Sequence, residues 1–97
     1  MSYTQPSETI VNQIKKLFYG YHMKFNLYTK EDGYYIDVSD MYEYISFKDD
    51  MSILAGYNKI AELLNVTNGE EYDRDCETTG CPTCNYGSEY KLTLHFW

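Results

Sequence analysis

Basic side chains are scarce in this sequence. Its 97 residues include eight Lys and Arg against 15 Asp and Glu, which gives a formal net charge of −7. Proteins that bind nucleic acid through its phosphates need a basic surface, because lysine and arginine supply much of that affinity. The composition therefore argues against direct binding of nucleic acid. It suits a basic protein partner, or it simply keeps a small protein soluble.

Long apolar runs are also missing. No window approaches 18 consecutive apolar residues, and the first residues show no basic region followed by an apolar stretch. Cysteine is rare, and three is an odd number that fits a reducing compartment better than a framework of disulfides. We therefore expect a soluble cytoplasmic protein that does not contact a membrane.

Groups suited to catalysis are few. The two histidines, His22 and His95, lie on the polar sides of expected strands, where we expect them to be exposed to solvent. Neither has a Ser, Cys or Asp at a spacing typical of a nucleophile and its base. The sequence has no glycine-rich phosphate loop and no calcium-binding loop. We therefore predict a protein that is not an enzyme, with no catalytic residues and no required cofactor.

The length predicts one domain spanning residues 1–97, with residues 1–6 as a disordered arm. Ser7 is a candidate N-cap for a first helix, and Pro6 is an alternative start. Gly20 is the expected end of this helix. One apolar face at helical spacing supports it, formed by Ile10, Val11, Ile14, Leu17, Phe18 and Tyr21.

Alternation of apolar and polar residues predicts a hairpin of two strands, 23–28 and 34–39, joined by a turn over residues 30–33. A third strand is expected within 40–48, although neither of its faces is cleanly polar. Asp49 or Asp50 is then expected to cap a second helix that carries apolar residues at helical spacing from Ile53 to Leu64. In the middle of that helix, Gly56 should permit a close approach to the sheet.

Residues 70–77 are rich in acids and are expected to form a connector, after which alternation over 90–96 predicts a final strand. The resulting order is α-β-β-β-α-β. We therefore predict an α+β domain with a four-stranded, mostly antiparallel sheet and two helices on one face. The final strand could lie in the middle of this sheet or at its edge.

The cysteines cluster near the end of the chain. Cys81 and Cys84 have the CxxC spacing of a zinc knuckle. A tetrahedral site needs four ligands, and Cys76 and His95 are candidates for the other two, with Asp75 or a second chain as alternatives to His95. The competing interpretation is that the thiols fill a tight loop without metal. A redox role is less favoured, because CxxC here precedes a strand rather than beginning a helix.

Acidic residues are interleaved with tyrosines in two stretches. The residues we predict to bind a partner are Asp37, Asp40, Tyr42, Glu43 and Tyr44 in the first stretch, and Glu70, Glu71, Tyr72 and Asp73 in the second. Spaced carboxylates can imitate the phosphates of a nucleic acid, and tyrosine supplies contact area at low entropic cost. The expected partner is therefore a protein with a basic surface. A homo-oligomer also remains open.

The segment CPTCNYGSEYKLTLHF, Cys81 to Phe96, resembles the ends of small uncharacterised phage and prophage proteins. Those proteins finish in CxTC, then Asp or Asn, then Tyr-Gly-Ser-x-Tyr and a strand. The resemblance implies a small phage protein that acts on a target in the cytoplasm of the host cell. Acidic single-domain inhibitors of host nucleases, including anti-CRISPR proteins, are similar to this chain in size and charge.

The predicted function is therefore non-enzymatic inhibition of a host nucleic-acid-binding or defence protein. Two alternatives remain, a small structural zinc protein and a component of a phage particle.

Overall fold

The structure is a computed structural model that describes residues 3–19, 23–40, 46–78 and 88–97. Its helices are α1 (Glu8–Lys15) and α2 (Ile53–Leu64), with a short 3₁₀ turn at Lys48–Asp50. Its strands are β1 (Phe18–Tyr19), β2 (Lys24–Lys30), β3 (Gly33–Asp40), β4 (Ser46–Phe47), β5 (Gly69–Thr78) and β6 (Ser88–Phe96).

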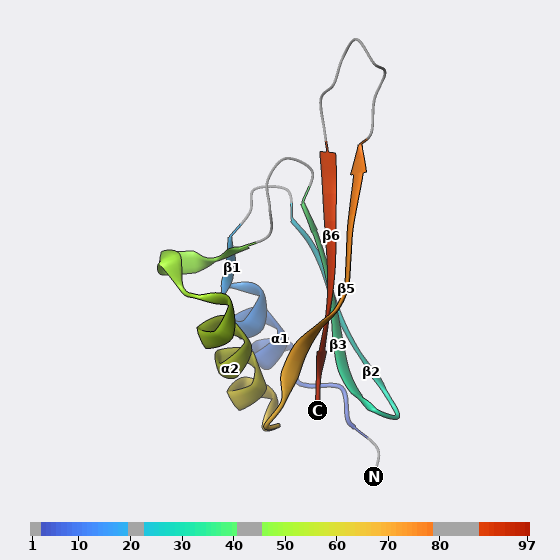
Figure 1. The fold of residues 1–97 in the computed structure, drawn as a ribbon. Coiled ribbons are helices and arrows are strands. Elements are labelled where there is room, and N and C mark those ends of the chain that lie inside the picture. The colour runs from blue at the N-terminus through green and yellow to red at the C-terminus, as the bar shows by residue number, and fades with distance from the viewer. Residues whose placement is uncertain (1–2, 20–22, 41–45, 79–87) are drawn as a thin grey trace.

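The larger sheet has four strands in the order β2-β3-β6-β5, and each neighbouring pair is antiparallel. Both helices lie on the same face of this sheet, as predicted (Figure 1). A separate two-stranded sheet joins β1 to β4. The predicted α+β class is confirmed, and β6 lies inside the larger sheet. No helix in the described part of the chain is long and apolar enough to cross a bilayer.

The first helix starts where the sequence predicts and ends earlier. Ser7 is extended, and its hydroxyl accepts a hydrogen bond from the backbone N–H of Ile10 at 3.4 Å, which confirms it as the N-cap. The helix ends at Lys15, so the predicted end at Gly20 is wrong. Phe18 instead enters β1, where it pairs with Phe47 and is 2% exposed. Packing of these two rings overrides the local helical spacing.

The hairpin of β2 and β3 matches the prediction. Its register runs from Lys24 opposite Ser39 to Lys30 opposite Gly33. Gly33 has φ of +142°, and a side chain there would also collide with the backbone oxygen of Phe96. The turn therefore needs glycine for two separate reasons.

The expected third strand over 40–48 is wrong for the larger sheet. Its described end, Ser46–Phe47, forms β4 and pairs with β1 instead, while residues 41–45 lie outside the described part. The predicted caps of the second helix are also wrong. Asp49 and Asp50 have φ of 58° and 54°, whereas an N-cap needs extended backbone, and Ser52 supplies it by accepting from the N–H of Ala55 at 3.1 Å.

The expected acidic connector is a strand. Residues 69–78 form β5, which pairs with β6 along its whole length and makes one edge of the sheet. Sequence alternation misses it because its charged residues point to both sides. Edge strands often carry such charges, which discourage pairing with other chains.

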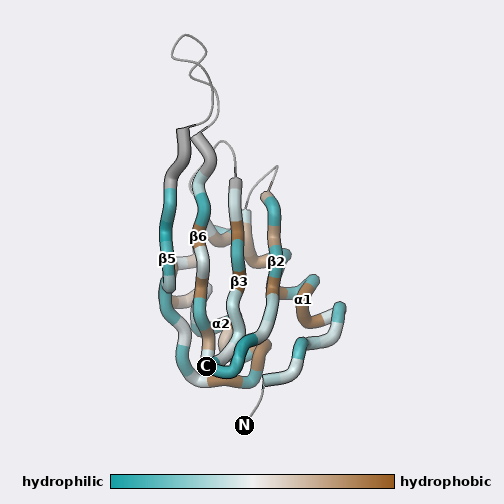
Figure 2. The backbone as a smooth tube through the Cα atoms, turned by 90° about the vertical axis from the view of Figure 1, so that its right-hand side faces the viewer, coloured by the Kyte–Doolittle hydropathy of each residue, from teal (hydrophilic) through white to brown (hydrophobic). Residues whose placement is uncertain are grey.

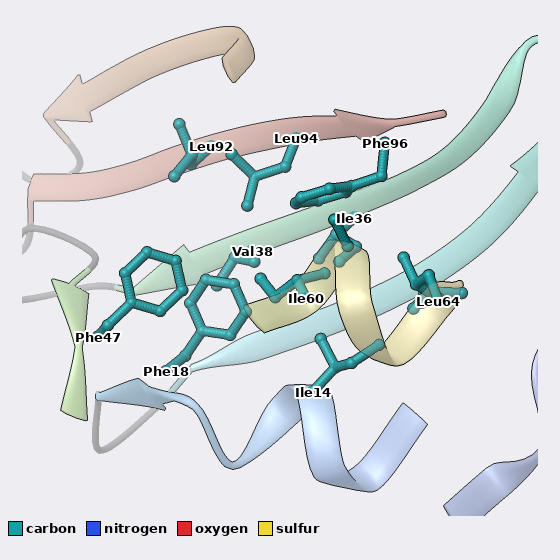
Figure 3. Packing of buried hydrophobic residues seen from close by; sticks show 12 residues of the cluster. Ile14, Phe18, Ile36, Val38, Phe47, Ile60, Leu64, Leu92, Leu94 and Phe96 are labelled. Atoms are coloured by element: carbon teal, nitrogen blue, oxygen red, sulfur yellow. The ribbon is translucent and has the colours of Figure 1, made fainter. Parts of the chain in front are cut away.

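The core lies between the helices and one face of the larger sheet. Figure 3 shows Ile14 of α1 and Ile60 of α2 beside side chains of β3 and β6. The largest fully buried side chains in the described part of the chain are Ile14, Ile36, Val38, Ile60, Leu94 and Phe96. Gly56 of α2 permits a close approach, as predicted, but the group that approaches is the ring of Phe47 in β4.

Tyr3 and Gln5, which lie within the arm of residues 1–6 that was expected to be disordered, contact the hairpin, whereas residues 1–2 lie outside the described part. The ring of Tyr3 lies edge-on to Tyr34 with centroids 5.3 Å apart. The side-chain amide of Gln5 donates to the backbone oxygen of Leu27 at 3.0 Å. This segment therefore occupies part of the outer edge of β2, whereas β5 forms the opposite edge.

Candidate functional site

The face of the larger sheet turned away from the helices is not covered by any described element, and Figure 2 views the molecule from that side. We call it the open face. The strand register arranges its residues in three rows that run across the sheet. The rows are Lys24, Ser39, Lys91 and Asp75; then Asn26, Asp37, Thr93 and Asp73; then Tyr28, Tyr35, His95 and Glu70.

Stacked rings dominate the third row. Tyr35 stacks on Tyr28 at 5.6 Å and on His95 at 4.5 Å between centroids. His95 stacks in turn on Trp97 at 4.7 Å, and Tyr72 stands edge-on to Tyr35 at 5.3 Å. We call these five residues the aromatic row. Its edge is accessible, because the Tyr72 side chain is 61% exposed.

Hydrogen bonds fix the centre of the aromatic row. The Tyr35 hydroxyl donates to Asp32 Oδ2 at 2.8 Å, and Nε2 of His95 lies 2.8 Å from the backbone oxygen of Asp32. Burial, followed by the hydrogen bond to Asp32, raises the pKa of Tyr35 to about 12. The expectation of a solvent-exposed His95 is wrong, because its ring is half-buried between two aromatic neighbours.

Asp37 is the central acid of the second row. Its Oδ1 accepts hydrogen bonds from the Thr93 hydroxyl at 2.9 Å and from the Tyr28 hydroxyl at 3.3 Å. Burial raises the pKa of Tyr28, and the Asp37 carboxylate raises it further. Within the described part of the chain, Oδ2 of Asp37 and the carboxylate of Asp73 have no hydrogen-bond or ion-pair partner. Both can accept bonds from a bound molecule.

The first two rows form a hollow of about 360 Å³ in the open face. Lys24 and Lys91 line one side of it, and Asp37, Asp73 and Thr93 line the side next to the aromatic row. The hollow therefore has both cations in its first row, together with Asp75, whereas Asp37 and Asp73 in its second row have no cation beside them in that row.

Acidic side chains follow the edge strand β5. A bulge between Glu71 and Asp73 inserts Tyr72 as an extra residue in the pairing with β6. As a result, Glu70 and Asp73 pair with His95 and Thr93, which are two residues apart and belong to the same face. Glu71 pairs with buried Leu94 on the other face, where it forms an ion pair with Arg74.

The structure brings together four of the nine predicted binding residues, because Asp37, Glu70, Tyr72 and Asp73 share the open face. Glu71 faces the helix side, and Asp40 closes β3 opposite Tyr90. Tyr42, Glu43 and Tyr44 lie outside the described residues. Sequence reasoning missed the aromatic row as a unit, although alternation had placed its members of β3 and β6 on a polar side.

The predicted zinc ligands are not all brought together. Cys76 pairs with Tyr90, and His95 lies five residues further along β6. At about 3.4 Å per residue, that separation is about 17 Å, whereas a zinc ion bonds its ligands at about 2 Å. His95 is therefore not positioned to join Cys76 on one metal. Cys81 and Cys84 lie outside the described residues, so their part of the prediction stays open.

Among the described residues, no group of three or more His, Cys, Asp or Glu is placed to hold a metal ion. Comparisons with protein-family models, with curated proteins and with solved structures give no significant match. Function is therefore inferred from the open face itself. The exposed Tyr72, beside the carboxylates of Asp37 and Asp73, is suited to binding cationic and planar groups.

Proposed function

We propose that this protein is a non-enzymatic binding module whose open face and β5 edge occupy a basic surface on a partner protein. The observation that carries the proposal is the position of three acids. Asp37, Glu70 and Asp73 lie on the face that the helices leave uncovered, beside the exposed edge of the aromatic row. Interfaces commonly combine aromatic contact area with charges that select the partner.

The spacing of the acids on β5 supports mimicry of a nucleic acid. Glu70, Asp73 and Asp75 pair with His95, Thr93 and Lys91, which are every second residue of β6. Their backbones are therefore about 7 Å apart, because each strand residue advances about 3.4 Å. The bulge at Tyr72 keeps this spacing regular by absorbing one extra residue. A regular line of negative charges along an exposed edge imitates a phosphate backbone.

The proposed partner is a nucleic-acid-binding or defence protein of a host cell, and the proposed effect is inhibition. Filling a basic groove with carboxylates excludes its natural ligand without any chemistry. The resemblance of the chain ending to phage proteins supports a phage setting and action in the cytoplasm of the host. The overall charge of −7 would also accelerate association with a basic target at low salt.

Capture from a nuclease-treated host lysate tests this proposal. The nuclease removes nucleic acid, which would otherwise bridge basic proteins to the bait. We expect a basic nucleic-acid-binding protein to be retained, and to elute as the salt concentration rises, because salt screens exposed charges. Asp73→Lys should abolish retention.

Glu62→Lys is the matched control for this variant. Glu62 is exposed on α2, far from the open face, and the substitution changes the net charge equally. The proposal would be contradicted if retention did not depend on the salt concentration. It would also be contradicted if Asp73→Lys and Glu62→Lys weakened retention equally.

A further inference from the structure

We propose that the hollow in the open face is a binding site for a guanidinium group, so that the partner contributes an arginine side chain to it. This inference rests on the proposed function and names the chemistry of the contact. The group would lie above Thr93, between Asp37 and Asp73, with its stem directed over the aromatic row.

The two carboxylates are arranged for a forked donor. Asp37, Thr93 and Asp73 occupy neighbouring positions on β3, β6 and β5. Strands are roughly 5 Å apart, so the two acids flank Thr93 at roughly 10 Å between backbones. Their side chains can converge on a group between them. Guanidinium carries five N–H donors in a plane and can bond two carboxylates along different edges.

The acceptors needed for this contact are available. Both hydrogen bonds to Asp37 end on Oδ1, which leaves Oδ2 without a partner in the described structure. These two bonds, from Tyr28 and Thr93, also hold the carboxylate in one orientation before any ligand arrives. Asp73 is exposed and has no partner in the described part of the chain. A preoriented acceptor lowers the entropic cost of binding.

The aromatic row independently indicates a cationic ligand. It lies two residues along each strand from Asp37 and Thr93, which is about 7 Å. The chain already places one of its own cations there, because Lys30 Nζ lies 4.8 Å from the Tyr35 ring centroid and 5.8 Å from that of Tyr28. Tyr72 is the exposed ring of the row, and planar guanidinium stacks on such a ring better than ammonium does.

The lysines of the hollow determine on which side of it the bound guanidinium group lies. Lys24 and Lys91 belong to the first row, which also contains Asp75 and lies on the side of Asp37 and Thr93 away from the aromatic row. A bound cation is therefore held toward the aromatic side, where Asp37 and Asp73 face it and the lysines are most distant.

Two peptides of equal charge test the inference directly. One repeats Gly-Arg and the other repeats Gly-Lys, both with blocked ends, and each is titrated into the full chain by calorimetry. Trp97 gives a second signal, since it is the only tryptophan and stacks on His95 in the aromatic row. We expect the arginine peptide to bind at least about fivefold more tightly, because only guanidinium bonds both carboxylates and stacks.

Two variants test whether Asp37 and Asp73 cause the preference for arginine. Asp73→Asn should reduce the ratio of the two peptide affinities to near unity. The fold of this variant should be retained, because the Asp73 side chain is exposed and unpaired in the described structure. Asp37→Asn should act in the same way, since the amide oxygen can still accept from Thr93 and Tyr28. Glu62→Gln removes the same charge from α2 and should keep the preference.

The outcomes separate this inference from the proposed function. If neither peptide binds at low salt, the proposed function fails together with the inference. If both bind equally, the acidic face survives as a binding surface and the guanidinium site is wrong. An arginine preference that persists in Asp73→Asn and Asp37→Asn would likewise overturn the site.

Discussion

Gly56 offers the sharpest test of how α2 packs. A Cβ built on this residue would lie less than 3 Å from three atoms of the Phe47 ring. That ring is 8% exposed, lies 4.9 Å from Phe18 between centroids and contacts Tyr57, so it has little room to move. Replacing Gly56 by Ala therefore sets a favourable helical change against a steric collision.

The two effects can be compared in magnitude. Alanine in a helix interior is favoured over glycine by about 1 kcal/mol. Forcing an extra methyl into a packed core costs about 1 to 3 kcal/mol. We therefore expect Gly56→Ala to lower the free energy of unfolding by about 1 kcal/mol, against the helical preference.

A second substitution identifies the cause. Phe47→Leu removes two of the three ring atoms that the new methyl would meet. In that background we expect Gly56→Ala to become neutral or stabilising, which gives a coupling of about 1 to 2 kcal/mol between the two sites. Urea unfolding followed by the fluorescence of Trp97, the single tryptophan, measures each variant.

Asn58→Ala serves as the control for helix propensity, because Asn58 is exposed on the same helix. It should stabilise both backgrounds equally, by about 0.5 kcal/mol. If Gly56→Ala stabilised the wild-type protein by the full helical preference, the close packing of α2 against Phe47 would be refuted.

Further predictions concern pH and metal. Because the folded state raises the pKa of Tyr35 to about 12 from its ordinary value of 10.0, its contribution to stability is complete below about pH 10 and disappears as pH rises through about 12. Unfolding measured across this range should show a decline that is weaker in Tyr35→Phe, and an equal decline in both would refute the role of burial and Asp32. His95→Ala should leave the zinc affinity of the chain unchanged, because His95 is about 17 Å along β6 from the partner of Cys76. Calorimetric zinc titration checks this, and a loss of affinity would contradict the register.

Periodicity in the sequence is enough to predict the elements that bury one clean face. The two helices, the hairpin and β6 all alternate apolar with polar residues at the spacing of their structure. The same periodicity does not predict β5, because Glu70 and Glu71 point to opposite faces and both are exposed. It does not predict the end of α1 either, because Phe18 lies in β1 and pairs with Phe47, which is 29 positions away.

The open face could be predicted only in part. Asp37 and Asp73 stand out in the sequence as acids near tyrosines, and Tyr72 is the tyrosine beside Asp73. Their common position depends on β6 lying between β3 and β5, and on the bulge that turns Tyr72 and Asp73 to one side. Both facts are pairing choices between distant segments, which local patterns do not encode.

Hydrogen exchange of the protein with and without its captured partner tests the central claim most directly. If the open face and the β5 edge form the interface, amides of β5 and β6 should exchange more slowly in the complex, while those of α1 and the exposed side of α2 should be unaffected. Slower exchange confined to the helices, with β5 unchanged, would contradict the account.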